Sequence, residues 1–466
     1  MKTRTEKDSL GTREVPAEAY WGIQTLRASE NFPVSGLREP AWLIDAYMYI
    51  KKAAAETHSE LAVIDEERAA AIVQACDEIL GGRLRDQFVV DVFQAGAGVS
   101  FHMNVNEVLA NRALEILGEP RASYARLHPN DHVNMSQSTN DTFPTAMHLA
   151  VLLAWRDFEP VLEKLADAFH AKGDEFADAI KSGRTHLQDA VPVTLGQEMH
   201  AYGAALDRAV AAIDGAVGAL VELPIGGNAA GTGINLPDGY RATILRQLSE
   251  LTGFELLKAA DPRERLQSHQ PMTGVSAALR NLALELIRIA NDLRLLDSGP
   301  LTGLKEITLP ARQPGSSIMP GKVNPVMPEC LNQIAFHVVG ADTVVALAAQ
   351  AGQLEINVMQ PVMIWEILFS IEILRNFLEV FRTGCVEGIV ADRARMEDYA
   401  HKSPSLATAL NPVIGYAKAA EIVKKALAEN RRVSDVALEE TDLDRETLDR
   451  ILSPENLTGQ LEREGQ

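Results

Sequence analysis

The stretch LRNLALELIRIANDLRLL, residues 279–296, decides the fold of this 466-residue chain. Its apolar residues recur at steps of three and four: Leu279, Leu282, Leu286, Ile289, Leu293 and Leu296. At about 3.6 residues per turn these positions share one face, so the stretch predicts a long helix with a buried stripe. Comparable patterns occur elsewhere, at 146–178, 196–222, 328–350 and 355–382. Together they predict a mainly α fold with a central bundle of about five long helices.

The sequence on either side of these helices is organised differently. Residues 1–139 mix helical patterns, near 43–58 and 66–80, with turns, and the residues from 395 onward form a small helical region. We therefore expect three domains: a mostly helical one at 1–139, the long helices at 140–394 and a small helical one at 395–466.

Two segments lack periodicity. Trp21–Pro33 is interpreted as an ordered loop. Ile225–Gly233 is rich in glycine, but it has neither the GxGxxG nor the P-loop spacing, and no strand pattern precedes it. It therefore indicates a structural turn and not a nucleotide-binding loop.

The overall charge argues against two classes of partner. The chain has 64 acidic and 44 basic residues, a net charge of −20 and a pI of about 5.0, so nucleic acid and anionic membranes would be repelled. Cys76, Cys330 and Cys385 include no CxxC pair, which argues against a disulfide framework or a thiolate zinc site. The N-terminal residues have no apolar targeting region and no run is long enough to span a bilayer, so we expect a cytoplasmic protein without a membrane partner.

The loop Gly315–Pro325, GSSIMPGKVNP, is suited to hold an anion. Gly315 and Gly321 permit backbone geometries in which N–H groups point at a ligand. The loop also carries side chains that bind anions or move protons: Ser316, Ser317, Lys322 and Asn324. An acidic protein needs such a local site to hold an anionic substrate.

GSSIMPGKVNP resembles the signature loop of the aspartase/fumarase superfamily, whose members eliminate a group from a succinyl skeleton to form fumarate. Four more segments are similar to superfamily sequences: WGIQTLRASENF (21–32), SQSTND (136–141), GRTHLQDA (183–190) and AGQLEINVM (351–359). Most of them resemble the aspartase branch, whereas HPND (128–131) looks more like fumarase. The resemblance covers essentially the whole chain. It implies a three-domain subunit of a homotetramer in which three subunits share each active site.

By this resemblance the chain is expected to be an ammonia-lyase that reversibly deaminates L-aspartate, a small dicarboxylate, to fumarate by anti elimination. Ser316 would be the base, ionised by backbone N–H groups of its loop and by nearby positive charge. Negative charge would then spread into the adjacent carboxylate as an aci form. The flanking glycines predict that the loop opens and closes. No organic cofactor is expected, and no metal ligand set can be read from the sequence.

The resemblance also assigns the residues that hold the substrate. It implies three groups of contacts: Lys322 and Asn324 with one carboxylate, Ser138, Thr139 and Ser317 with the other, and Asn140, Thr185 and His186 with the amino group. Glu329 stands where the superfamily has a carboxylate paired with His186, so a His–Glu pair is expected. His186 either binds the substrate, which we favour, or transfers a proton.

The segment from Gly96 to Glu107 departs from the superfamily pattern. Aspartases usually read GTSxNMN, but this chain has Val99 at the threonine position and His102 at the first asparagine position. We still expect Val99 to line the substrate site, where valine has the volume of threonine without its hydroxyl and a hydrogen bond is lost. His102 either contacts the leaving group or is a packed, satisfied histidine in the site wall.

Three alternatives to aspartate deamination remain open. The HPND segment keeps a fumarate hydratase possible, and Val99 with His102 would suit an altered or N-substituted aspartate. The third alternative is a helical oligomer without catalytic activity. The intact site residues argue against it: Ser316, Lys322, Asn324, Thr185 and His186.

Overall fold

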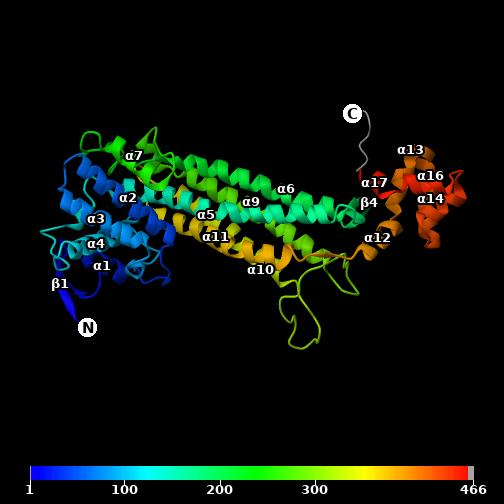
Figure 1. Ribbon diagram of the computed structural model, residues 1–466, viewed down its shortest axis with the longest axis horizontal. Coiled ribbons are helices and arrows are strands. Elements are labelled where there is room, and N and C mark those ends of the chain that lie inside the picture. Colours follow the sequence, from blue (N-terminus) through cyan, green and yellow to red (C-terminus); the bar gives the residue numbers. More distant parts are fainter. Residues whose placement is uncertain (1, 460–466) are drawn as a thin grey trace. The chain divides into compact units, whose positions relative to one another are not determined.

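A computed structural model describes residues 2–459 of the chain, and most of its helices are labelled in Figure 1. The chain forms two compact units, each made of three separate stretches. The first unit consists of Met1–Glu159, Ala211–Ala283 and Phe336–Arg375. The second consists of Pro160–Val210, Leu284–Ala335 and Asn376–Gln466. The three-domain division at 139 and 394 stays a prediction.

The five long helices expected from the sequence are present. They are α5 (Thr139–Glu175), α6 (Leu195–Val217), α9 (Gln270–Leu296), α10 (Val326–Gln350) and α11 (Gln360–Phe381). All six apolar residues of the stripe on α9 are buried. The prediction of a mainly α fold with a helical bundle is therefore confirmed.

Polar contacts tie the long helices to one another inside each unit. In the first unit, Ser276 of α9 donates a hydrogen bond of 2.7 Å to Asp342 of α10. In the second unit, Asn332 of α10 donates one of 2.9 Å to Asn291 of α9. Both donors, Ser276 and Asn332, are buried, and an unpaired polar group would be costly there.

Close approach of α5 and α6 in the second unit depends on two glycines. A Cβ on Gly173 of α5 would lie 2.5 Å from the ring of His200 of α6. Reciprocally, a Cβ on Gly203 of α6 would lie 2.7 Å from the ring of His170 of α5. The two rings also contact each other, with 3.1 Å between their Nδ1 atoms. Each histidine ring thus packs against the glycine of the opposite helix.

Among the described residues, six further α-helices belong to the first unit. They are α1 (Ile23–Asn31), α2 (Ala41–Glu60), α3 (Glu66–Leu80), α4 (Val99–Ile116), α7 (Tyr240–Thr252) and α8 (Pro262–Gln267). The predicted helices near 43–58 and 66–80 correspond to α2 and α3. The interpretation of Trp21–Pro33 as a loop is wrong, because most of it is α1.

Distant carboxylates explain why α1 forms without a local signal. Glu107 of α4 accepts hydrogen bonds from the backbone N–H groups of Gly22, Gln24 and Thr25 at 2.8–3.0 Å. Glu6 accepts one from Ile23 at 3.0 Å. These groups satisfy the free N–H groups of the first helical turn, which a local capping residue usually does.

Short helices complete the second unit at its C-terminal end. They are α12 (Arg393–Lys402), α13 (Asn411–Ile414), α14 (Tyr416–Glu429), α15 (Val433–Glu440), α16 (Arg445–Ile451) and α17 (Pro454–Leu457). Leu410, Ile422, Val436 and Leu448 belong to a small apolar core that these helices and the turn before them share. The helical character expected for 395–466 is therefore observed up to residue 459, and residues 460–466 lie outside the described part of the chain.

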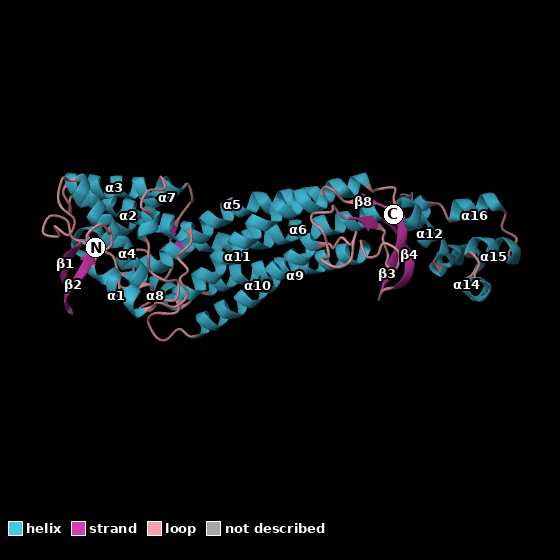
Figure 2. Cartoon of the chain, turned by 90° about the horizontal axis from the view of Figure 1, so that it is seen from below, coloured by secondary structure: helices cyan, strands magenta, loops and turns pink. Residues whose placement is uncertain are grey.

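Strands are few and short, as Figure 2 shows by colour. They are β1 (Thr3–Asp8), β2 (Gly11–Pro16), β3 (Ile180–Thr185), β4 (Gln188–Thr194), β5 (Glu222–Leu223), β6 (Leu257–Lys258), β7 (Ile307–Thr308) and β8 (Val390–Ala391). They pair in order as four two-stranded sheets, antiparallel except for β5 with β6. The hairpin of β3 and β4 joins α5 to α6 and carries part of the candidate site.

The helix α10 is apolar but largely uncovered in the single chain. Only 33% of its most apolar stretch is buried, and Phe336 and Leu347 are exposed. By length and composition it could cross a membrane, and it is the one helix among residues 2–459 of which this is true. The expectation that no run is long enough was therefore too strict.

Candidate functional site

The SQSTND segment is held rigidly at the N-terminus of α5. Asp141 is fully buried, and its carboxylate accepts hydrogen bonds from the backbone N–H groups of Ser138, Gly226 and Asn228 at 2.8–3.0 Å. The Ser138 hydroxyl accepts one from the N–H of Asn140 at 3.2 Å. Asp141 and the Ser138 hydroxyl thus satisfy backbone N–H groups at the start of α5, which places Ser138, Thr139 and Asn140 at the helix end. Burial raises the pKa of Asp141 to about 6.

The glycine-rich loop at 225–233 forms hydrogen bonds with the SQSTND segment and has no nucleotide-binding motif. Besides the bonds from Gly226 and Asn228, the carbonyl of Ala229 accepts a hydrogen bond of 2.7 Å from the Asn140 side chain. The loop closes on itself through a bond of 3.0 Å from the N–H of Gly233 to the carbonyl of Gly227. Its interpretation as a structural turn is confirmed. One donor of Asn140 is consequently engaged by the loop.

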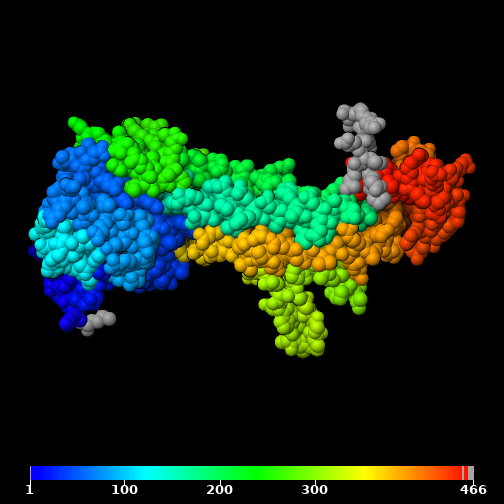
Figure 3. Space-filling view, in the orientation of Figure 1, coloured from blue at the N-terminus to red at the C-terminus, as the bar shows by residue number. Residues whose placement is uncertain are grey.

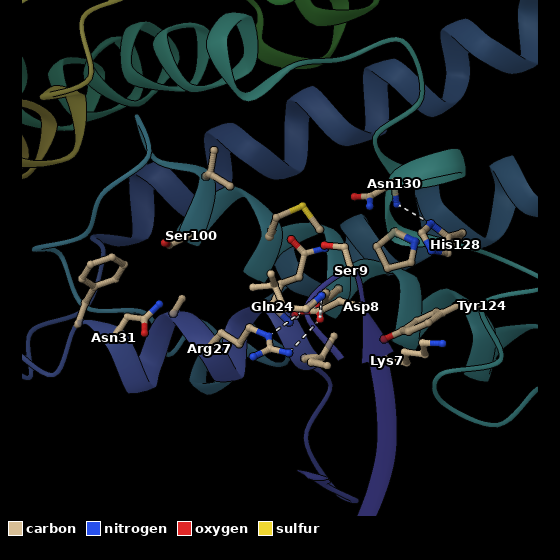
Figure 4. Close-up of a pocket in the computed structure, with 18 residues that line it drawn as sticks. Lys7, Asp8, Ser9, Gln24, Arg27, Asn31, Ser100, Tyr124, His128 and Asn130 are labelled. Atoms are coloured by element: carbon tan, nitrogen blue, oxygen red, sulfur yellow. Dashed lines mark hydrogen bonds and ion pairs between the residues drawn. The ribbon is translucent and has the colours of Figure 1, made fainter. Parts of the chain in front are cut away.

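Val99 and Ser100 begin α4 and line a pocket of about 500 Å³, shown in Figure 4. Val99 is 40% exposed. Gly98, with φ 87°, precedes the helix, and a Cβ there would lie 2.0 Å from the ring of Phe143 of α5. The glycine therefore lets the start of α4 pack directly against the helix that carries SQSTND.

Arg27 also lines this pocket, but its charge is paired. It forms an ion pair with Asp8 at 2.8 Å, drawn as a dashed line in Figure 4. The hydrogen bond from Arg27 lowers the pKa of Asp8. Of the sequence-predicted residues only Val99 lines the pocket, and Ser138, Thr139 and Asn140 do not.

His102 is a buried, satisfied histidine. Its side chain is inaccessible, its Nδ1 lies 2.7 Å from the Thr139 hydroxyl, and its Nε2 lies 2.7 Å from Nζ of Lys51. The ring of Tyr47 stacks on it with centroids 5.3 Å apart. Burial lowers the pKa of His102 well below its usual value, so the ring is neutral. Of the two readings of His102, the packed residue in the site wall agrees with the structure.

Thr185 and His186 lie at the tip of the β3–β4 hairpin in the second unit. Thr185 pairs with Gln188, so His186 and Leu187 are the two central residues of the turn. Both have left-handed backbone conformations, with φ of 55° and 58°. This is the geometry of a type I′ turn, for which glycine and asparagine are normally preferred. The strained tip displays an exposed His186, and such strain is typical of functional positions.

A buried ion cluster fixes the base of that hairpin. Glu306 is fully buried and accepts two hydrogen bonds from Arg184 at 2.8 and 3.0 Å. Lys181 reaches the same carboxylate at 3.1 Å and Glu198 at 2.8 Å. Two charged residues of β3 are therefore anchored, while the tip projects into solvent. The hairpin was not predicted, because GRTHLQDA was interpreted only as a polar break between helices.

The loop Gly315–Pro325 is closed at its neck by backbone contacts. The N–H of Gly315 donates to the carbonyl of Lys322 at 2.7 Å, and the Asn324 side chain donates to the carbonyl of Gly315 at 2.7 Å. A Cβ on Gly315 would lie 2.6 Å from that Lys322 oxygen, so only glycine fits. In Figure 3 the yellow-green segment that includes the loop stands out from the surface.

The hydroxyl of Ser316 is a hydrogen-bond acceptor for the backbone of its own loop. Its Oγ accepts hydrogen bonds from the backbone N–H groups of Ile318 at 3.2 Å and Met319 at 2.9 Å. Two N–H dipoles aimed at one hydroxyl oxygen favour negative charge on that oxygen. The arrangement can lower the free energy of a deprotonated serine.

The other predicted residues of the loop face outward. Ser317 and Lys322 are exposed, and Lys322 makes no ion pair with any described residue. Glu329 is half-buried in the first turn of α10. Between residues 2 and 459 no ion pair joins Glu329 to His186, so the expected His–Glu pair stays a prediction.

The predicted residues thus fall into two groups. Val99, Ser138, Thr139 and Asn140 belong to the first unit, and the remaining ones to the second: Thr185, His186, Ser316, Ser317, Lys322, Asn324 and Glu329. Sequence reasoning missed Lys51 and Asp141. A lysine at an apolar position of the α2 pattern, four residues after Tyr47, is a signal that could have identified Lys51.

Comparison with known proteins gives the same family throughout the chain. Residues 11–340 match the family model described as Lyase, and residues 406–459 match Fumarase C C-terminus. The chain is 48% identical to the aspartate ammonia-lyase of Bacillus subtilis (strain 168), over 98% of this chain and 96% of that protein. It is 45% identical to the class II fumarate hydratase of Thermosynechococcus vestitus, over 98% of each.

A solved structure supports the same assignment. The fold matches the crystal structure of a fumarate lyase:delta crystallin from Brucella melitensis with a TM-score of 0.94 and 49% identity, covering 97% of this chain and 99% of that one. The predictions of a superfamily member and of a carbon–nitrogen lyase are confirmed by these relatives. The chain belongs to the aspartase/fumarase superfamily of lyases.

Proposed function

We propose that this lyase reversibly deaminates L-aspartate to fumarate in the cytoplasm. The aspartate ammonia-lyase among its relatives, at 48% identity, supports the substrate. The WGIQT segment, Ser138-Thr139 and AGQLEINVM resemble the aspartase branch and support it further.

The observation that carries the proposal is the position of Ser316 beneath two backbone N–H groups of its own loop. A free serine hydroxyl is far too weak a base for a Cβ proton. Two N–H donors at 2.9 and 3.2 Å, in a loop with the cation Lys322, support its ionised form. Ser316 would take the Cβ proton, and the electron pair of that C–H bond would move into the adjacent carboxylate as an aci form.

Elimination then follows from the aci form. The electron pair returns to form the Cα–Cβ double bond, the C–N bond breaks on the opposite face, and ammonia leaves. Ser138, Thr139 and Ser317 would hold the carboxylate that carries the developing charge, and Lys322 with Asn324 would hold the other. Removing one donor to a developing oxyanion typically costs about 3 kcal/mol in the transition state. Asn140, Thr185 and His186 would contact the amino group, and Glu329 would orient His186.

We further propose that the active site forms between copies of the chain in a homotetramer. The uncovered apolar surface of α10, with Phe336 and Leu347, supports packing against another copy. The exposed His186 at the hairpin tip, without a carboxylate partner among residues 2–459 of its own chain, agrees with a site completed by a neighbour.

Fumarate formation, followed by its ultraviolet absorbance, tests the proposal when L-aspartate and L-malate are offered separately. We expect rapid fumarate from L-aspartate only. Fumarate from L-malate only would overturn the proposal in favour of a hydratase, an activity to which the hydratase relative and the HPND segment point.

A second candidate is elimination from an altered or N-substituted aspartate. It is favoured by Val99 alone, since an apolar side chain in place of threonine suits a less polar amine. If neither L-aspartate nor L-malate gives fumarate, N-substituted aspartates are the next substrates to offer. Turnover of these compounds alone would replace the proposal with the second candidate.

A further inference from the structure

Three side chains form a buried chain that ends at the proposed substrate site. Lys51 of α2 lies 2.7 Å from Nε2 of His102 of α4, and Nδ1 of His102 lies 2.7 Å from the hydroxyl of Thr139, the first residue of α5. Lys51 and His102 are fully buried, whereas Thr139 is half-buried and accessible. The proposed function uses only Thr139. It gives Lys51 and His102 no role.

The surroundings of Lys51 fix the direction of its hydrogen bonds. Besides His102, it contacts Oδ1 of Asn134 at 3.0 Å and Oε1 of Gln137 at 2.9 Å. The Asn134 amide nitrogen donates to the carbonyl of Gln137, and the Gln137 amide nitrogen donates to the carbonyls of Val133 and Met135. Both amide oxygens must therefore face Lys51. Two fixed acceptors and one ring nitrogen match the three donors of an ammonium group.

This arrangement selects one tautomer of His102. If the Lys51 ammonium donates to Nε2, that nitrogen carries no proton. A neutral ring then has its proton on Nδ1 and donates it to the Thr139 oxygen. Because Thr139 accepts from the ring, its own O–H bond must point elsewhere, toward the accessible side of α5.

We propose that Lys51 and His102 are positioning residues, which act through this tautomer to hold the Thr139 hydroxyl as a hydrogen-bond donor toward the substrate carboxylate. The inference rests on the proposed function, in which Thr139 holds the carboxylate that gains charge. A hydroxyl that is already oriented loses no rotational freedom as the charge develops. His102, which departs from the superfamily pattern, thus orients Thr139, which follows that pattern.

The same geometry predicts how the hydroxyl responds to pH. If Lys51 loses its proton, the amine donates to Asn134 and Gln137 and accepts from Nε2–H of His102. Nδ1 then accepts from the hydroxyl of Thr139, which no longer donates to the substrate. The titratable groups around Lys51 are Asp141 on α5, Cys76 on α3 and His58 on α2, in addition to His102.

These groups act on the Lys51 charge in different directions. Burial lowers the pKa of Lys51 well below its usual value, and Asp141 opposes that shift. The Cys76 thiol stays neutral because burial raises its pKa. The donor arrangement is therefore present below the pKa of Lys51 and lost above it, so kcat would decrease as the pH rises through that pKa.

Kinetics of three variants test the inference. In His102→Gln the new amide can occupy the place of Nε2 and keep the hydrogen bond with Lys51. The same amide is too far from Thr139 to replace the bond that Nδ1 makes. His102→Gln and Lys51→Met are each expected to lower kcat about tenfold or more and to change KM less than about threefold. Lys51→Met is also expected to remove the decrease in kcat that accompanies deprotonation of Lys51.

His148→Gln is the matched control. His148 is also a buried histidine of the first unit, and its Nδ1 contacts the carbonyls of Leu220 and Glu222 at 3.1 Å. Substitution removes a buried Nδ1 contact there too, but none with a substrate residue. We expect lower thermal stability with wild-type kcat. A kcat decrease equal to that of His102→Gln would overturn the inference, since loss of packing alone would then explain both.

A readout independent of activity separates this inference from the proposed function. Solid-state NMR of protein labelled with ¹⁵N-histidine distinguishes a protonated from an unprotonated Nδ1, and the His102 signal is identified by its loss in His102→Gln. We expect protonated Nδ1 and unprotonated Nε2 at the low-pH end of a titration and the reverse tautomer at its high-pH end, and the reverse tautomer at every pH would overturn the inference. If the wild type acts only on L-malate, the proposed function fails, while the NMR experiment and the same variants assayed with L-malate still test the orientation of Thr139.

Discussion

The SQSTND segment and the loop Gly315–Pro325 both carry proposed substrate contacts, but they are held in opposite ways. In the first, Asp141 is buried beneath three backbone N–H groups, and Thr139 is fixed through His102 to the buried Lys51. In the second, bonds close the neck, and the residues from Ser317 to Val323 are exposed.

The difference separates two tasks of one reaction. A segment that must offer donors in a fixed direction benefits from a buried, saturated hydrogen-bond network. A segment that admits substrate and then excludes water must be able to move, so it has few contacts with the rest of the chain. Limited proteolysis would show this directly: substrate is expected to protect the loop, and no protection would contradict loop closure.

The largest effect is expected from Ser316→Ala. Removing the proposed base should decrease kcat by about a thousandfold or more, while the thermal stability stays within about 0.5 kcal/mol of the wild type. Steady-state fumarate formation and a thermal melt measure the two quantities.

Ser298→Ala is the control for that substitution. The Ser298 hydroxyl also accepts a backbone hydrogen bond, from Leu304 at 3.1 Å, but it lies outside the proposed site. Its activity should be close to the wild type. Residual activity of Ser316→Ala above a few per cent would rule out Ser316 as the base.

Glu39→Gln is expected to change how the unfolding free energy of the protein depends on pH. Glu39 accepts a hydrogen bond from Gln94, which in turn accepts one from the N–H of Phe101 in the first turn of α4. Burial raises the pKa of Glu39 to about 8. Between pH 4.5 and 8 the unfolded chain ionises this group while the folded one retains the proton, so the unfolding free energy falls as the pH rises, by on the order of 5 kcal/mol in total.

Glutamine cannot ionise, so the variant should lose this part of the pH dependence. Its unfolding free energy should match the wild type near pH 5 and exceed it at pH 8, as measured by urea denaturation. The exposed Glu119→Gln is the control and should leave the wild-type pH dependence in place. Parallel curves for Glu39→Gln and the wild type would show that Glu39 is already ionised in the folded protein.

A smaller effect is expected when the neck of the loop is altered. In Gly315→Ala the new methyl group would press on the carbonyl of Lys322, 2.6 Å away, so the loop would open or shift. We expect kcat/KM to fall roughly ten- to a hundredfold with little change in the melting temperature, because the loop contributes few buried contacts.

Gly215→Ala is the matched control for the neck. Gly215 lies within α6, and a Cβ there meets nothing within 4 Å. That substitution should leave activity unchanged and raise stability by about 0.5–1 kcal/mol. Wild-type activity in Gly315→Ala would mean that the neck does not determine where Ser316 lies.

The smallest effect is expected from Val99→Thr. A hydroxyl at this half-exposed position would restore one substrate contact, so KM for L-aspartate should fall about three- to tenfold. Val99→Ala distinguishes volume from hydrogen bonding, since it removes the methyl groups without adding a hydroxyl. If both variants change KM in the same direction and to the same extent, side-chain volume and not the hydroxyl is responsible.

Much of the fold could be predicted from the sequence because the long helices have local signals. The repeat on α9 is a property of eighteen consecutive residues, and burial of its stripe follows from periodicity alone. The loop Gly315–Pro325 was recognisable for a similar reason, since its glycines, serines and lysine lie within eleven residues.

Features that depend on distant residues could not be predicted in this way. The helix α1 begins where Glu107 and Glu6 satisfy its first N–H groups, and neither residue lies within the segment that forms the helix. The β3–β4 hairpin is held by Glu306, more than a hundred residues away in the sequence. Lys51 was missed because the acceptors that make its burial tolerable belong to α4 and to the segment before α5.

The reciprocal packing of His170 on Gly203 and of His200 on Gly173 sets the alignment of α5 with α6. The two contacts are spaced by three residues on each helix, in opposite directions, so they mark one antiparallel register. Sliding either helix by one turn would place both rings against residues with side chains. Because the β3–β4 hairpin connects these two helices, their alignment fixes where the hairpin begins and ends. The helix pair therefore determines how far the imidazole of His186 extends beyond the helices.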